Sequence, residues 1–376
     1  MNQPAQYDPG IELVDVTAES QRQFNLCNAC RYCEGFCPVF PAMSAHRWHD
    51  TTNLHLAEYF AHLCHQCTAC YHACQYKSPH MYAVNLPQAL NRVRLDSFQA
   101  HAWPMRLSAG FTHNPILTFV CVAVAIISTL VLAFALQGTA TVTGVHTGPG
   151  AFYEVISHTL IVLSAGLSLG FAVLAMLISW HRYAHSIGLR IERVSIAAWW
   201  RALRDSLQLT HLGGGHGQGC NVEDERFSNQ RRWLHHCTAY GFALCFAATC
   251  AATVYELGLG IMSPFPITSL PVVLGTVGGI GLIIGPIGLL LLKHRFHSAV
   301  KDPTLSELDT TLCVSLLLIS LTGFALLLAR ETAAMGILLA IHLGFVLAFF
   351  VSLPYGKFVH MGYRFLALLK SADESV

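Results

Sequence analysis

Charged side chains are scarce in this sequence. Asp, Glu, Lys and Arg make up 11% of the 376 residues, whereas about 25% is usual in a soluble domain. Hydrophobic residues account for 53%, and the mean hydropathy is +0.48. The shortage is uneven, because residues 1–110 have the composition of a soluble domain and nearly everything after residue 115 is apolar blocks between polar loops. The sequence therefore predicts a soluble domain over 1–110 and a membrane domain over 111–376.

Several functional signals are also missing. The net charge is +1 and no basic patch with interleaved aromatic residues occurs, so we expect no nucleic acid partner. The glycine-rich stretch 213–219 lacks a preceding strand and a Gly-Lys-Ser/Thr ending, which favours a linker over a phosphate-binding loop. No flavin motif is visible. The polar stretch Met1 to Thr17 lacks a basic region followed by an apolar core, so we expect no signal peptide and a cytoplasmic N-terminal domain.

Six segments are apolar enough, and long enough, to cross a bilayer, which takes roughly 20 residues. They are Pro115–Leu136, Val155–Trp180, Thr238–Gly258, Pro271–Leu292, Thr310–Ala329 and Met335–Tyr355. The third is the weakest, because polar side chains that include Glu256 interrupt it. Buried helices of a soluble protein are the alternative interpretation.

The distribution of Lys and Arg predicts the orientation of these spans. The loop 181–234 holds eight of them and the loop 293–309 three, while the alternate loops 137–154 and 259–270 hold none. Positive charge stays on the cytoplasmic side. We therefore expect a multi-pass protein of the bacterial inner (cytoplasmic) membrane with both termini in the cytoplasm. Apolar residues at helical spacing from Ile196 to Leu207 predict a further helix lying on the membrane surface.

Eight of the fourteen cysteines form two runs of the same spacing. The first run is Cys27, Cys30, Cys33 and Cys37, followed by Pro38, and the second is Cys64, Cys67, Cys70 and Cys74. In such runs three cysteines hold one [4Fe–4S] cluster and the fourth binds the other cluster. The predicted ligand sets are Cys27, Cys30, Cys33 and Cys74 for one cluster, and Cys64, Cys67, Cys70 and Cys37 for the other.

Zinc is the alternative for these runs, but it suits a single Cys-x2-Cys pair better than two four-cysteine runs. Between the runs, apolar residues recur at helical spacing and no alternating strand pattern occurs. This predicts an α-helical ferredoxin, and four thiolates per cluster leave no open site, so one-electron transfer is the expected chemistry. We expect the other six cysteines, Cys220 among them, to pack as small hydrophobic side chains.

Histidines inside or capping the spans are candidate haem ligands, because ionisable groups at membrane depth are costly and usually functional. They are His158, His235, His236, His342 and His360. Two facing imidazoles can hold a b-type haem, and we expect one or two haems. His342 and His360 are preferred, since a continuous helix would place them on one face unless Pro354 breaks it. The alternatives are ordinary hydrogen-bonded histidines, or ligation by His181, His185, His294 and His297.

The chain resembles the tricarballylate (citrate) utilisation protein B family. The resemblance covers about residues 20–370 and is strongest at Cys30–Pro41, Leu63–Tyr76, Asp224–Ser228, Arg231–His236 and Leu353–His360. It implies a ferredoxin domain fused to a six-span haem-type membrane domain. It also implies a separate FAD-dependent dehydrogenase, which oxidises tricarballylate or a similar acid and passes its electrons to the membrane. The sixth span is more loosely similar to the last haem-binding helix of nitrate reductase gamma subunits.

The resulting expectation is an all-α protein, with an α-helical di-cluster ferredoxin domain followed by a six-helix transmembrane bundle. Its expected function is electron transfer from the reduced flavoprotein through two [4Fe–4S] clusters and haem b to quinone, as one component of an oxidoreductase system. A membrane-anchored iron–sulfur redox sensor is the alternative, although no output segment is visible. A transporter is disfavoured because Glu256 is the exception among spans nearly free of interior charge.

Overall fold

The computed structural model describes residues 16–46, 54–113, 115–214, 217–222 and 224–375. Within these ranges the regular structure is helical apart from one short hairpin, in which β1 (Cys220–Asn221) pairs antiparallel with β2 (Phe227–Ser228). The predicted all-α class is confirmed. Most of the stretch Met1 to Thr17 and the centre of the glycine-rich stretch 213–219 lie outside the described residues.

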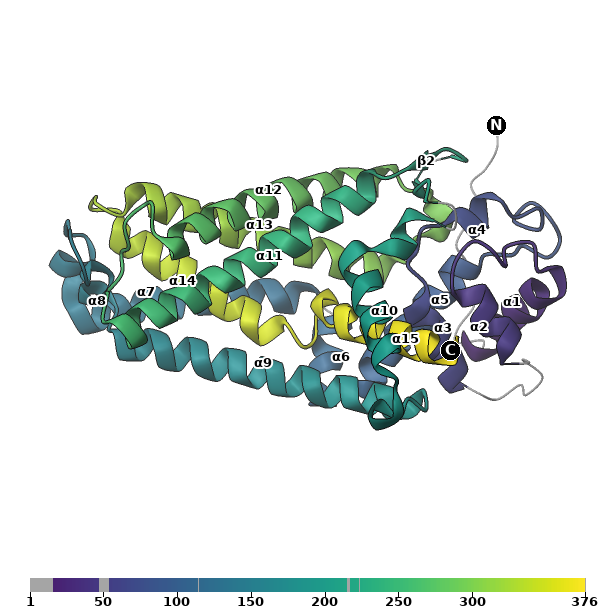
Figure 1. The fold of residues 1–376 in the computed structure, drawn as a ribbon. Helices are drawn as coiled ribbons and strands as arrows, with labels where there is room; N and C mark the ends of the chain where they lie inside the picture. The colour runs from purple at the N-terminus through teal and green to yellow at the C-terminus, as the bar shows by residue number, and fades with distance from the viewer. Residues whose placement is uncertain (1–15, 47–53, 114, 215–216, 223, 376) are drawn as a thin grey trace, which may run out of the picture.

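The helices of the cysteine-rich segment gather at one end of the molecule (Figure 1). They are α1 (Val16–Cys30), α2 (Val39–Ala45), α3 (Leu54–Leu63), α4 (Ala69–His72) and α5 (Leu86–His101). Asn85 starts α5 because its side chain accepts a hydrogen bond from the backbone N–H of Gln88. No strand occurs among the described residues of this segment, in agreement with the expected helical ferredoxin.

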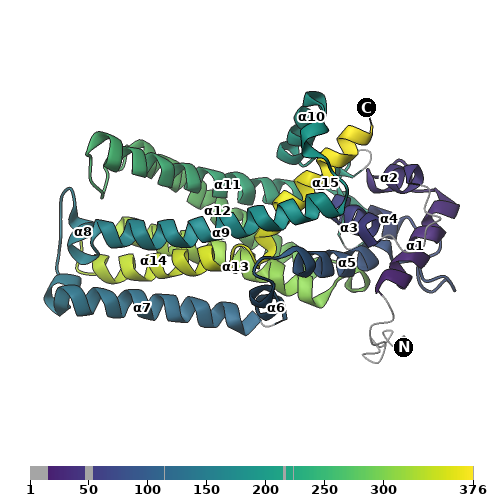
Figure 2. The same cartoon turned by 90° about the horizontal axis from the view of Figure 1, so that it is seen from below.

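Six long helices run side by side from that end (Figures 1 and 2). They are α7 (Pro115–Val142), α9 (His158–Ser186), α11 (Gln230–Thr253) with a π-helical turn at Val254–Gly258, α12 (Leu270–Arg295), α13 (Pro303–Ala329) and α14 (Met335–Ser352). All six are long and apolar enough to cross a membrane. The third has the lowest mean hydropathy of the six, 1.6, as its polar residues predicted.

Shorter helices complete the described chain. They are α6 (Met105–His113), α8 (Ala151–Val155), α10 (Ile196–Gln208) and α15 (His360–Glu374), with 3-10 turns at Ile191–Arg193, Thr210–Gly213, Ser298–Val300 and Lys357–Val359. The α10 helix packs Ala198 and Ala202 inward and leaves Ile196, Trp200 and Leu207 exposed. This is the amphipathic pattern that the sequence predicted for a helix on the membrane surface.

Glycines bring α11 and α12 into close contact. A Cβ atom added to Gly278 would lie 2.7 Å from the carbonyl oxygen of Gly241, and one added to Gly241 would lie 2.8 Å from that of Gly278. Only glycine permits this approach, as in other close membrane helix pairs. The contact fixes α11, which carries His235 and His236.

The cysteine-rich helices and the adjoining ends of the long helices share one hydrophobic core. Phe24 and Phe60 belong to the same buried cluster as Tyr183 of α9, Leu305 of α13 and Tyr363 of α15. A shared core holds the two parts at a fixed separation.

The sixth span and the C-terminal helix are separate elements. The α14 helix ends at Ser352, a turn contains Pro354, and α15 begins at His360. Because Pro cannot continue a helix without loss of a backbone hydrogen bond, the chain changes direction here. His342 and His360 therefore do not share a face of one continuous helix.

Candidate metal centres

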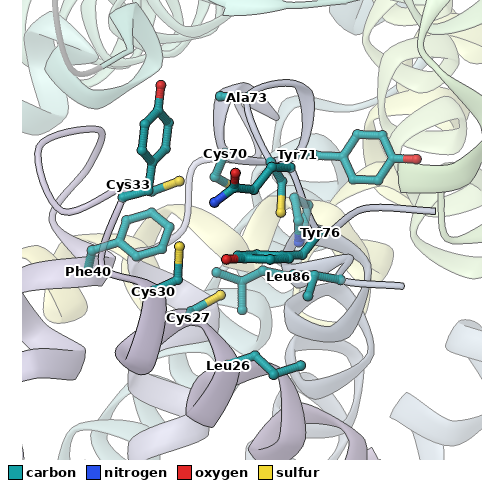
Figure 3. A pocket seen from close by; sticks show the side chains of 15 residues that line it. Leu26, Cys27, Cys30, Cys33, Phe40, Cys70, Tyr71, Ala73, Tyr76 and Leu86 are labelled. Atoms are coloured by element: carbon teal, nitrogen blue, oxygen red, sulfur yellow. The ribbon is translucent and has the colours of Figure 1, made fainter. Parts of the chain in front are cut away.

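The two cysteine runs meet as two crossed sets. Cys27, Cys30, Cys33 and Cys74 line a cavity of about 220 Å³, which Cys70 also borders. Figure 3 shows the labelled sulfurs of Cys27, Cys30, Cys33 and Cys70 around this space. The charge of a Cys27 thiolate would interact with those of Cys33, Cys74 and Cys30. We call Cys27, Cys30, Cys33 and Cys74 the first set.

The remaining four cysteines form the second set, Cys37, Cys64, Cys67 and Cys70. Cys37 interacts electrostatically with Cys67 and Cys64. Cys70 interacts with Cys67, Cys37 and Cys64, and more weakly with Cys33 of the first set. The last cysteine of each run therefore lies with the first three of the other run. The spacing predicts the same grouping, and substitution of the cysteines tests it.

Backbone geometry turns the thiols inward. Arg31, Gln66 and Thr68 have positive φ angles of 56°, 55° and 58°, which are uncommon for residues other than glycine and make tight turns within each run. The backbone N–H of Gln66 donates to Cys64 Sγ at 3.4 Å. Such N–H groups stabilise the thiolate form that binds iron.

Burial and neighbouring sulfurs make the thiols of Cys27 and Cys67 weak acids. Burial and nearby thiols, Cys33 first, raise the pKa of Cys27 to about 12. Burial and the Cys220 thiol raise the pKa of Cys67 to about 12. A bound iron core would favour the deprotonated form of these thiols. No three His, Cys, Asp or Glu side chains of the described ranges converge as they would around one metal ion; the sulfurs of the first set surround a cavity instead.

The two sets differ in exposure. Cys30 of the first set is exposed, whereas Cys64 and Cys67 of the second are each 8% exposed. Cys30 is therefore open to solvent, while Cys64 and Cys67 lie in the interior, where Arg94 of α5 and Arg364 of α15 contact the Cys64 carbonyl.

The segment before α11 encloses the second set. The backbone N–H of Asn221 donates to the Cys67 carbonyl at 3.1 Å, and Thr68 Oγ1 donates to the Asn221 carbonyl at 2.6 Å. The adjacent Cys220 is fully buried and belongs to the same hydrophobic cluster as Cys67. Sequence reasoning treated Cys220 as a packing residue, and its spacing carries no sign of its position beside a predicted ligand.

Arg364 contacts the second set and lies on the same helix as His360, one of the predicted histidine ligands. Arg364 Nη2 donates to the Cys64 carbonyl at 2.8 Å, and Arg364 lies about one helical turn from His360 on α15. The rings of His360 and His235 have centres 6.2 Å apart and planes inclined at 74°. Two imidazoles on opposite sides of one iron have ring centres roughly 6 Å apart, given iron–nitrogen bonds of about 2 Å. The distance between the rings of His235 and His360 is therefore of the size that two imidazoles bound to one iron would have.

Local hydrogen bonding prepares His360 as a ligand. Its Nδ1 lies 2.5 Å from the carbonyl oxygen of Lys357, so a proton on Nδ1 leaves Nε2 free to bind metal. Burial, together with the charge of Arg364, lowers the pKa of His360 well below its usual range. The neutral imidazole, which is the form that ligates iron, is therefore favoured.

The other predicted histidines have different surroundings. His342 Nδ1 lies 3.0 Å from Thr322 Oγ1, and His158 Nε2 lies 3.4 Å from a carboxylate oxygen of Glu256. The ring centre of His236 is 5.6 Å from that of Tyr240, away from the His235–His360 pair. Among the ring contacts in the described part of the chain, no imidazole partner occurs for His342 or His158.

Comparison with known proteins places these features in a family. The model of the citrate utilization protein B family matches residues 113–376, and that of its Fer4-like domain matches residues 20–100. The chain is 42% identical over 367 residues to citrate utilization protein B of Escherichia coli, covering 96% of this chain and 93% of the relative. The chain belongs to the citrate utilization protein B family. No solved structure matches it.

The two regions matched by the family models contain the clustered cysteines and the predicted histidines, respectively. All eight clustered cysteines fall in the Fer4-like region of the citrate utilization protein B family, which indicates an iron–sulfur electron-transfer protein. The five predicted histidines fall in the other matched region, which holds the six helices able to cross a bilayer.

Proposed function

We propose that this protein carries electrons from a soluble flavoprotein to quinone in the bacterial inner membrane. The donor is the reduced flavin of a separate FAD-dependent dehydrogenase that oxidises tricarballylate or a related acid. The observation that carries the proposal is the order in which the candidate sites adjoin one another. The cavity of the first set is also bordered by Cys70 of the second, and Arg364 donates to the Cys64 carbonyl about one helical turn from His360, whose ring lies near that of His235.

Each set of four thiolates would hold one [4Fe–4S] cluster and supply one-electron transfer. The exposure of the cysteines sets the proposed direction of electron transfer. Cys30 is exposed, so electrons enter at the first set. Cys64 and Cys67 are buried in the hydrophobic interior next to the membrane helices, so the second set passes them on.

His235 and His360 would hold a haem b near the cytoplasmic ends of the spans. When bound, the haem supplies a further one-electron carrier within reach of the bilayer. His342, deeper in α14, is the candidate ligand of a second haem, with His158 and His236 as further candidates. Quinone dissolves in the bilayer, so the membrane half is the natural exit for electrons.

The charge of the loops supports the orientation. The Lys- and Arg-rich loops lie at the same end as the cysteine-rich helices (Figure 1). By the positive-inside rule this end faces the cytoplasm, where both termini and the dehydrogenase would be found.

Absorbance and EPR spectra of the purified protein test the cofactor content. Reduced-minus-oxidised absorbance should contain the bands of a low-spin b-type haem, and the reduced protein should give signals from two clusters. Stoichiometric zinc with no iron signal after anaerobic purification would overturn the proposal.

A further inference from the structure

Three arginines converge on the backbone of the second set. Arg94 of α5 donates through Nη2 to the Cys64 carbonyl at 2.8 Å and through Nε to the Ala61 carbonyl at 3.1 Å. Arg364 of α15 donates to the same Cys64 carbonyl at 2.8 Å. Arg231 of α11 donates to the Gln66 carbonyl at 2.5 Å. Three separate helices therefore deliver positive charge to one short loop.

None of these three arginines forms an ion pair with a carboxylate of the described residues, although the charge of Asp309 acts on Arg94 and Arg364 from a distance. Among the ion pairs of the described residues, none involves Arg94, Arg231 or Arg364, and the nearby Asp309 pairs with Lys357 at 3.0 Å. Arg94 is only 1% exposed, and Arg364 Nε is buried without a hydrogen-bond partner. Like charges held together in a poorly solvated interior are costly unless an anion lies close by. Neutral thiols do not meet that need, whereas a thiolate-bound cluster does.

The first set has a different electrostatic environment. Arg31, next to Cys30 in the sequence, is paired with Glu34 at 3.0 Å, and both side chains are largely exposed. The nearby Lys77 Nζ donates to the His72 carbonyl at 2.8 Å. Solvent and a carboxylate therefore reduce the positive charge that acts on the first set.

Net charge and hydrogen bonding set the potential of a cluster. Reduction adds a negative charge, which burial disfavours and neighbouring cations favour. Burial alone would make the second cluster harder to reduce than the first. The positive charge of the three arginines acts in the opposite direction and makes reduction easier.

We infer that Arg94, Arg231 and Arg364 raise the reduction potential of the cluster at the second set above that of the cluster at the first set. The inference rests on the proposed pair of clusters. It makes the second cluster the acceptor, so that each electron entering at the solvent-facing cluster moves toward His360.

Redox titration of the full-length protein, followed by EPR, tests the inference. Cys30→Ser identifies the signal of the first cluster by its loss. In the otherwise unchanged protein the second cluster should be reduced at the higher potential. Arg231→Gln and Arg364→Gln should each lower its ratio of reduced to oxidised form, at a fixed applied potential, by about ten-fold, the order expected for one nearby charge at intermediate dielectric.

Charge-conserving and distant substitutions provide the controls. Arg231→Lys and Arg364→Lys should retain most of the potential, and Arg201→Gln, on the exposed face of α10, should change neither cluster. Arg231 is only partly buried, so Arg231→Gln keeps the test available if Arg364→Gln fails to fold. Equal potentials in the unmodified protein, or no shift in the glutamine variants, would refute the inference while two cluster signals persist. Absence of the two signals would instead refute the proposed function.

Discussion

The ring of His235, near the start of α11, lies 6.2 Å from the ring of His360, at the start of α15. His235 lies near the middle of the membrane domain in sequence and His360 near its C-terminal end, and the turn around Pro354 brings them together. The sequence predicted His342 and His360 as the preferred ligands, on one face of a continuous helix, and left the partner of each open. The break between α14 and α15 separates those two and leaves His360 facing a different helix.

This pairing predicts a shared spectral phenotype. His235→Ala and His360→Ala should each remove the same low-spin b-type component from the reduced-minus-oxidised absorbance spectrum, because an iron with one axial imidazole changes spin state or loses its haem. His55→Ala, at an exposed position on α3, is the control. His342→Ala should leave this component and remove a second one, if two haems are bound. Wild-type spectra from both His235→Ala and His360→Ala would show that the pair is not a haem site.

The crossed cysteine sets predict which substitutions act alike. The intact protein should contain about eight iron atoms per chain in clusters, in addition to haem iron. Cys27→Ser and Cys74→Ser should remove the same EPR signal, and Cys67→Ser and Cys37→Ser the other, each with a loss of about four iron atoms. Cys250→Ser, at an exposed position in α11, should remove neither. If Cys74→Ser and Cys67→Ser removed one common signal, each run would bind its own cluster.

Local patterns predicted most of the fold, because periodicity and composition act over short stretches of chain. The six spans were found from apolar runs, whereas the crossed cysteine sets stay a prediction from a spacing whose chemistry is stereotyped. The Arg364–Cys64 contact and the His235–His360 pair could not be found in this way. Each joins residues that are remote in sequence, and neither partner stands out from other buried arginines or histidines. Cys220 is a similar case, since only the folded chain places it beside Cys67.

The close approach of the α11 and α12 backbones predicts that a methyl group added at Gly278 destabilises the protein. Gly278→Ala should destabilise the protein by about 1–3 kcal/mol, because its Cβ would meet the Gly241 carbonyl oxygen at 2.7 Å. The displaced α11 should also weaken haem binding at His235. Gly166→Ala is a matched control in a membrane helix, since its Cβ would meet nothing within 4 Å. Thermal unfolding in detergent and haem content measure both effects, and equal behaviour of the two variants would contradict the prediction.

The side-chain carboxylate of Glu374, at the end of α15, predicts a pH-dependent contribution to the stability of the folded protein. Glu374 is bonded to His46 at 3.1 Å and to Lys370 at 2.7 Å. Although burial raises it, these hydrogen bonds lower the pKa of Glu374 to about 2. A depressed folded-state pKa stabilises the folded protein above the unfolded-state pKa, near 4.3, and this stabilisation is lost as the pH falls toward about 2.

Glu374→Gln should therefore cost about 1 kcal/mol at pH 7, a modest value because the carboxylate is partly exposed. The difference in melting temperature between wild type and Glu374→Gln should stay constant from pH 7 to about pH 5 and shrink at lower pH. Glu192→Gln, on an exposed turn, controls for the loss of a surface charge. A difference that grew on acidification would contradict the assigned sign.

The order of the carriers predicts where electron flow stops. Membranes that contain this protein should oxidise the reduced flavin of the partner dehydrogenase and reduce a quinone analogue. Cys30→Ser should stop both steps, because Cys30 belongs to the exposed set at which electrons enter. His360→Ala should stop quinone reduction yet leave the clusters reducible by the flavoprotein, since His360 lies on the membrane side of the second set. Stopped-flow absorbance and EPR of flash-frozen samples separate the two steps. The conduit would be ruled out if the flavoprotein reduced quinone at the same rate in membranes without this protein. A redox sensor would then account better for a cysteine-rich domain fixed by a shared core to six apolar helices.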